Sequence, residues 1–220
     1  MEKFIPRLDI LPAPQQRLWT ELSDVPPEFV LYGGTAIALH LGHRESIDFD
    51  FFVNQTFDPA KLELQVAFMR GAQITQRAPS TLTGIIDRDG VVKVSFFGLP
   101  HIPRLRTPHH VDENRMKVAS LLDLAGTKTS VVQARAEAKD YIDIDALIHV
   151  GNVDLPTALA AGRAIYGPQF NPEITLKALS FFDDGDLHKL PTAMKSRLAT
   201  AAREVDLYRL PKIDQTDNRE

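Results

Sequence analysis

The sequence contains no cysteine among its 220 residues, so disulfide bonds and zinc sites built from thiolates are excluded. No apolar run approaches the length of a membrane helix, and the first residues have no apolar signal core. We therefore expect a cytoplasmic protein without a membrane partner.

Several catalytic and nucleotide-binding motifs are also missing. The chain has no Gly-x-x-x-x-Gly-Lys-Ser/Thr loop and no Gly-x-Gly-x-x-Gly fingerprint, which excludes P-loop and Rossmann proteins. No nucleophile elbow is present, which argues against a Ser-His-Asp hydrolase. A formal charge of −4 does not fit a uniformly basic nucleic-acid coat, although a local basic groove is compatible with it.

The periodicity of the chain changes near its middle. Residues 28–97 alternate between strand and helix patterns, with a hairpin expected around Arg88-Asp89-Gly90. From Asp112 onward the pattern is helical. We therefore predict an α+β protein in which residues 1–111 form a mixed sheet with helices and residues 112–220 form a helical bundle.

The individual elements follow from the same patterns and their end signals, with helix N-caps expected at Asp58, Asp154 and Asn171, each followed by a proline at the helix start. Residues 99–111 contain three prolines and three histidines without a period, so we interpret them as a connector. The expected strands cover 28–32, 47–53, 73–77, 81–87 and 91–97, and the main expected helices cover 14–22, 35–41, 58–69, 114–133, 136–150 and 191–208.

Two acids stand out in the strand at residues 47–53. Side chains two apart on a strand share a face, so Asp48 and Asp50 should project together while Ile47, Phe49 and Phe51 point into the core. Carboxylate oxygens suit a hard cation such as Mg²⁺. An isolated Asp-x-Asp is usually only a solvent-facing edge, so this signal needs a second one.

The segment Gly33-Gly34-Thr35 supplies that second signal. Glycines allow the backbone to approach phosphates closely, and N–H groups at a helix N-terminus bind them. Thr35 is positioned to cap the helix and to hydrogen-bond a phosphate oxygen. Gly-Gly alone is usually a tight turn. When the glycine turn is followed by the strand with Asp48 and Asp50, however, the combination predicts a site for a magnesium-bound nucleoside triphosphate.

Other charged residues leave alternatives open. Arg44 either contacts phosphate or neutralises the acid pair when no metal is bound. Lys128 either reaches a triphosphate or is a surface lysine, and its spacing alone favours the surface lysine. Asp140 and Asp143 lie one helical turn apart. They orient Lys128 or Arg135, act as a base, or pair locally as helix-face acids.

Three further features are weaker. Ser95 occupies a strand position at which many metal-dependent transferases carry a third carboxylate. Either the site has two strand carboxylates, or the third acid comes from the helical half. His109-His110 is interpreted as a loop pair without a metal role. Five basic residues could meet an RNA backbone, although a solvated helix face is favoured: Lys189, Lys195, Arg197, Arg203 and Arg209.

Two stretches resemble a known family. Residues 32–39 (YGGTAIAL), followed by Gly42-His43-Arg44 and the acid strand, resemble the first motif of the AbiEii/MenT-like nucleotidyltransferase toxins. Residues 121–144, with Lys128 and Lys139-Asp140, resemble the lysine and aspartate motifs of that family. The matched stretches run in order from residue 30 to 148.

The resemblance implies a polymerase-β-like fold and transfer of a nucleoside monophosphate from an NTP, with release of pyrophosphate. It implies a toxin of a toxin–antitoxin or phage-defence system, with an antitoxin as partner and the tRNA 3′ end favoured as acceptor over a protein. The implied roles are magnesium binding by Asp48 and Asp50, triphosphate binding by Gly34 and Thr35, phosphate binding by Lys128 and catalysis by Asp140. The rival hypothesis is a degenerate member that binds a nucleotide or partner without turnover.

Overall fold

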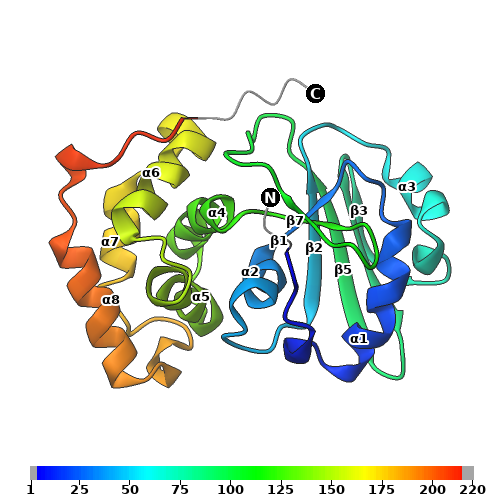
Figure 1. Ribbon diagram of the computed structural model, residues 1–220, viewed down its shortest axis with the longest axis horizontal. Coiled ribbons are helices and arrows are strands. Elements are labelled where there is room, and N and C mark those ends of the chain that lie inside the picture. Colours follow the sequence, from blue (N-terminus) through cyan, green and yellow to red (C-terminus); the bar gives the residue numbers. More distant parts are fainter. Residues whose placement is uncertain (1–3, 215–220) are drawn as a thin grey trace. The chain divides into compact units, whose positions relative to one another are not determined.

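The computed structural model describes residues 4–214, which form two compact units (Figure 1). The sheet unit comprises residues 4–102 and 108–119, and the helical unit comprises 103–107 and 120–214. The sequence predicts a domain boundary between residues 111 and 112, and this boundary stays a prediction. The compact units divide the chain differently, because residues 112–119 lie with the sheet.

The described residues of the sheet unit form a seven-stranded sheet with the order β3-β4-β5-β2-β1-β7-β6. Strand β2 runs antiparallel to β1 and parallel to β5, so the predicted mixed sheet is confirmed. The strands are β1 (Val30–Tyr32), β2 (Asp48–Val53), β3 (Gln73–Ala78), β4 (Thr81–Asp87), β5 (Val91–Gly98), β6 (His109–His110) and β7 (Lys117–Val118).

Short helices accompany the sheet: α1 (Ala13–Trp19), α2 (Gly33–Leu41) and α3 (Pro59–Gln65). The start of α3 follows from its sequence, because the Asp58 side chain accepts a hydrogen bond from the Ala60 N–H and proline occupies the first helical position. The alternating strand β2 buries Phe49 and Phe51 completely, and the Phe51 ring stacks on Phe96 of β5 at 5.3 Å. The aromatic face of β2 therefore belongs to the core of the sheet unit.

The helical unit contains α4 (Leu121–Ala134), α5 (Ala138–His149), α6 (Leu155–Tyr166), α7 (Pro172–Ala178) and α8 (Thr192–Glu204). Helices α4 and α6 approach closely at Gly126, where an added Cβ would lie 2.9 Å from the backbone carbon of Ala161. The predicted caps at Asp154 and Asn171 are confirmed by their hydrogen bonds to the N–H groups of Thr157 and Glu173. None of the helices within residues 4–214 combines the length and apolar character that a bilayer crossing needs.

Asp123, near the start of α4, explains why residues 103–107 belong to the helical unit. Its carboxylate accepts hydrogen bonds from the N–H groups of Leu105 at 2.7 Å and Arg106 at 3.1 Å, and from the Ser120 hydroxyl at 2.6 Å. Burial raises the pKa of Asp123, although these hydrogen bonds oppose the shift.

Three local predictions are wrong. His109-His110 is expected in a loop, but the two residues form strand β6 and pair with Val118 and Lys117 of β7. The helix expected from residue 114 begins only at Leu121, because Arg115 has a left-handed φ of +59° and Val118 pairs with Leu31 of β1. Met116 and Val118 are buried two residues apart, which is strand spacing and not helix spacing. Ile47 is 58% exposed instead of buried, because it precedes the first residue of β2.

Candidate functional site

Strand β2 carries Asp48 and Asp50 on one face of the sheet. Both acids are partly exposed, whereas the intervening Phe49 is fully buried on the opposite face. Asp50 lies in register with Tyr32 of β1 and Ser95 of β5. The two carboxylates therefore project together, as their spacing predicts.

The glycine turn lies directly against this acid face. Gly33 has a left-handed φ of +73°, and a Cβ added there would be 2.8 Å from Asp50 Oδ2. Within residues 4–214, no side chain caps the N-terminus of α2. The first N–H groups of α2, which include that of Gly34, are thus suited to bind an anion close to the carboxylates.

Thr35 is placed differently from the expectation. It is the third residue of α2 and is buried, and its hydroxyl contacts Ser46 Oγ at 2.7 Å and donates to the backbone carbonyl of Asp48. The predicted cap is therefore wrong, and the hydroxyl links α2 to the start of β2. A phosphate-binding role for Thr35 would rest on its backbone N–H.

Arg44 lies in the loop between α2 and β2. Its Nη1 donates a hydrogen bond of 2.8 Å to the carbonyl oxygen of Glu45. The side chain is partly exposed. Both roles considered for Arg44, phosphate contact and neutralisation of the acid pair, stay predictions.

The helical unit contains a buried ionic cluster formed by Lys128 of α4 and two acids of α5. Lys128 Nζ lies 2.9 Å from Asp140 Oδ1 and 2.9 Å from Asp143 Oδ2. Lys128 is 5% exposed, and both acids are fully buried. The surface-lysine alternative is therefore wrong, because the ammonium group bridges two helices inside the unit.

Arg135 extends this cluster toward solvent. Its Nε donates to Asp140 Oδ2 at 2.8 Å and its Nη2 to Asp140 Oδ1 at 3.2 Å, while its side chain is 46% exposed. Burial opposes ionisation of Asp140, but the hydrogen bonds from Arg135 and Lys128 outweigh it and lower the pKa of the carboxyl. Asp140 is thus an anion at neutral pH.

The two carboxylates of β2 provide only part of the ligands that a Mg²⁺ ion needs. Among the described residues, no group of three or more His, Asp or Glu side chains is arranged to hold a metal ion. Mg²⁺ is nevertheless often held by one or two carboxylates, with substrate phosphates and waters as its other ligands. Asp48 and Asp50 meet that requirement only together with a nucleotide.

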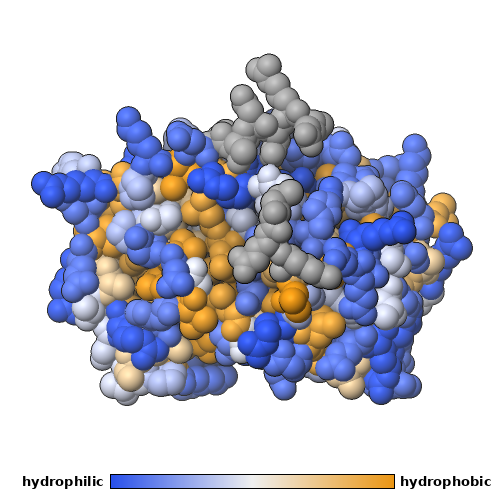
Figure 2. All heavy atoms as spheres, viewed as in Figure 1, coloured by the Kyte–Doolittle hydropathy of each residue, from blue (hydrophilic) through white to orange (hydrophobic). Residues whose placement is uncertain are grey.

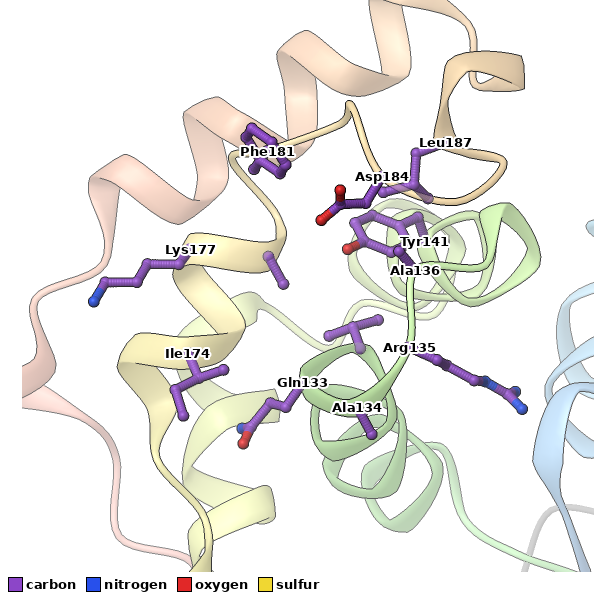
Figure 3. A pocket seen from close by; sticks show the side chains of 12 residues that line it. Gln133, Ala134, Arg135, Ala136, Tyr141, Ile174, Lys177, Phe181, Asp184 and Leu187 are labelled. Carbon is purple, nitrogen blue, oxygen red and sulfur yellow. The ribbon is translucent and has the colours of Figure 1, made fainter.

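A cavity of about 400 Å³ lies in the helical unit (Figure 3). Tyr141 and Asp184 are directed toward it, and Phe181 at its border is 51% exposed. The side chains of Lys177 and Arg135 extend away from it. Figure 2 also shows hydrophobic atoms at the surface over the helices on the left of the view. Of the ionic cluster, Arg135 is among the residues that line this cavity, whereas Lys128, Asp140 and Asp143 are not among them.

Most of the basic residues considered for RNA have partners within the helical unit. The contacts join Lys189 to Asp186, Lys195 to the ring of Phe182, Arg197 to Asp145 and Arg209 to Asp206. The pair between Arg197 and Asp145 is bidentate, with distances of 3.1 and 2.6 Å, and links α8 to α5. These contacts favour the solvated helix face over an RNA groove.

Comparison with known proteins gives one family match over most of the chain. The family model described as "Nucleotidyl transferase AbiEii toxin, Type IV TA system" matches residues 17–217. An uncharacterized protein from Aquifex aeolicus (strain VF5) is 28% identical over 159 residues, which cover 71% of this chain and 75% of that protein.

Two solved structures share the fold. MenT4, a nucleotidyltransferase toxin from Mycobacterium tuberculosis H37Rv, superposes with a TM-score of 0.57 at 16% identity, covering 88% of this chain and 83% of that one. A nucleotidyltransferase candidate from H. pylori gives a TM-score of 0.54 at 18% identity, covering 86% and 90%. The predicted fold, a nucleotidyltransferase-type sheet followed by a helical bundle, is thus confirmed.

Replacement of Lys128 by methionine should strongly destabilise the protein. The two buried acids would lose their shared cation, and removing one partner of a buried ion pair costs about 3–5 kcal/mol. Lys177→Met is the matched control, because Lys177 is exposed and should change the free energy of unfolding by less than about 0.5 kcal/mol. Urea unfolding measures both variants, and equal values for them would contradict the buried cluster.

Asp140→Asn should change the pH dependence of stability. A lowered folded-state pKa contributes stability that is present above the ordinary carboxyl pKa and lost as pH falls through the folded value. The stability difference between wild type and Asp140→Asn should therefore be largest at neutral pH and shrink below about pH 4. Asp123→Asn should show the opposite trend, because the pKa of Asp123 is raised. Unfolding curves between pH 2.5 and 7 would test both, and a constant Asp140 difference would contradict this account.

Proposed function

The chain belongs to the AbiEii nucleotidyltransferase toxin family, and we propose that it transfers a nucleoside monophosphate from an NTP to an acceptor hydroxyl with the help of Mg²⁺. The acceptor oxygen forms a bond to the α-phosphorus, the bond between the α-phosphorus and the bridging oxygen breaks, and pyrophosphate leaves. The hydroxyl proton passes to solvent or to a nearby base.

The observation that carries this proposal is the acid face of β2 against the glycine turn. Asp48 and Asp50 project together, and Gly33 approaches Asp50 so closely that a Cβ would collide with its carboxylate. Oxygen ligands for a cation thus lie beside uncapped helix N–H groups for phosphates. A bound Mg²⁺ would neutralise phosphate charge in the transition state.

In this mechanism the residues of the sheet unit mainly position the nucleotide and neutralise the charge of its phosphates. Asp48 and Asp50 hold the metal ion, and the N–H groups at the start of α2, including those of Gly34 and Thr35, hold the phosphates. Phosphoryl-type transfer needs little covalent chemistry from the protein, so positioning and charge neutralisation account for most of the rate. Arg44 is a further phosphate ligand in this proposal.

The ionic cluster of the helical unit serves the same reaction. Asp140 acts as an anion and not as a proton donor, because Arg135 and Lys128 lower its pKa. Lys128 fixes the carboxylate, and the partly exposed Arg135 presents positive charge to solvent. We propose that this arrangement, and not a free Lys128, supplies the phosphate contact from the helical unit.

The acceptor that we favour is the 3′ end of tRNA, and the second candidate is a protein hydroxyl. The family membership supports a toxin with a cognate antitoxin. The neutral Ser95 beside Asp50 supports the rival function, in which the fold binds a nucleotide or partner without turnover.

The direct test is incubation with α-³²P-labelled NTPs, tRNA and Mg²⁺. Label should enter the RNA, and Asp48→Asn should lower the rate by at least about 100-fold, because one ligand of the charge-neutralising ion is lost. Asp89→Asn is the matched control, since that acid is 85% exposed at a hairpin tip and should not affect the rate. Label in protein when RNA is omitted would identify the alternative acceptor. Nucleotide binding without any transfer would refute the enzyme.

Gly33→Ala should damage activity beyond its effect on stability. Gly33 and Gly71 both have left-handed φ, at +73° and +84°, so alanine at either should cost about 1–2 kcal/mol of stability. Only at Gly33 would the Cβ collide with Asp50 Oδ2, whereas at Gly71 nothing lies within 4 Å. The transfer rate should therefore fall on the order of 100-fold in Gly33→Ala and stay near wild type in Gly71→Ala. Equal rates in the two variants would show that the close approach has no function.

A further inference from the structure

The hydroxyl of Ser95 is a buried polar group for which residues 4–214 provide no hydrogen-bond partner. Ser95 is 1% exposed, and within residues 4–214 its Oγ forms no hydrogen bond. A buried hydroxyl without a partner lowers stability, so such a group in a folded protein needs an explanation. An ordered water or a bound ligand is the usual one.

The position of Ser95 links it to the acid pair. It lies opposite Asp50 on the neighbouring parallel strand and opposite Thr83 on the other side. Residues paired in this way project from the same face, and neighbouring strands are about 4.8 Å apart. The unpaired hydroxyl is therefore on the face that carries Asp48 and Asp50, one strand away from them.

The length of the Ser95 side chain determines which groups its hydroxyl can contact. The oxygen of serine is bonded directly to Cβ, whereas a carboxylate at the same position would extend one bond further. A cation held by the carboxylate of Asp50 would therefore be separated from Ser95 Oγ by about one water molecule, since O–H···O bonds are about 2.8 Å long. Mg²⁺ dehydrates reluctantly and keeps several waters in such sites.

We propose that Ser95 is a positioning residue that accepts a hydrogen bond from a water bound to the Mg²⁺ ion of Asp48 and Asp50. This inference rests on the proposed function, because it requires the metal at that site. The hydroxyl is neutral, so Ser95 adds no third negative charge to those of Asp48 and Asp50. Ser95 thus contributes through a water of the ion and not as a direct ligand.

Metal binding without substrate tests the proposal. Mn²⁺ is the probe, titrated by electron paramagnetic resonance into wild type, Ser95→Ala, Ser95→Thr and Thr83→Val, with Mg²⁺ as competitor. Ser95→Ala should weaken binding about tenfold, as loss of a hydrogen-bond partner to a metal ligand typically does. Ser95→Thr keeps a hydroxyl and should bind nearly as wild type. Thr83→Val is the matched control, because Thr83 is buried in the same row but one strand further from Asp50.

Thermal unfolding provides a second test. If Ser95 only stabilised the fold, its replacement would not change the effect of MgCl₂ on Tm. Without metal, Ser95→Ala should be as stable as wild type or slightly more stable, because it removes an unsatisfied hydroxyl. The increase in Tm on addition of MgCl₂ should nevertheless be smaller than in wild type. The variant would thus separate folding from metal binding.

The outcomes are distinguishable. If wild type binds no Mn²⁺, or Asp50→Asn binds as well as wild type, the metal site of the proposed function fails. If Asp50→Asn abolishes binding but Ser95→Ala binds like wild type, only the role of Ser95 is refuted. A lower Tm of Ser95→Ala in the absence of metal would also overturn the inference, because it would show that the hydroxyl stabilises the fold itself.

Discussion

The alternation of side chains along β2 is the constraint on which the proposed chemistry depends. Burial of Phe49 and Phe51 fixes which face of the strand is turned to the core, and this places Asp48 and Asp50 on the opposite face. A shift of the strand register by one residue would bury two charges. The same hydrophobic contacts that stabilise the sheet therefore determine where the carboxylates lie, and Gly33 leaves room for one of them.

The helical unit uses charge differently. Lys128, Asp140 and Asp143 are almost completely removed from water, so each charge must be compensated by its neighbours. Such buried pairs contribute little net stability but specify geometry, because breaking one leaves an uncompensated charge. Arg135 is the member of the cluster that remains partly exposed, and its guanidinium is therefore the group that we propose meets a substrate.

The fold was largely predictable, because hydrophobic period, caps and turn residues are local signals. The hairpin of β4 and β5 and the cap at Asp58 were confirmed. The segment before Leu121 was not predictable, since its short strand exists only through pairing with β1. For the candidate site, the shared face of the acids followed from spacing. The close approach of Gly33 to Asp50 and the burial of Lys128 depend on tertiary packing, which no motif encodes.

The central claim is that the acid face of β2 holds a divalent ion together with nucleotide phosphates. A crystal grown with Mn²⁺ and a non-hydrolysable NTP analogue, measured at the manganese absorption edge, tests it most directly. The account predicts an anomalous peak within coordination distance, about 2.2 Å, of oxygens of both Asp48 and Asp50, with phosphate oxygens completing the shell and contacting the first N–H groups of α2. Ordered triphosphate bound elsewhere, or manganese absent from these two carboxylates, would contradict it.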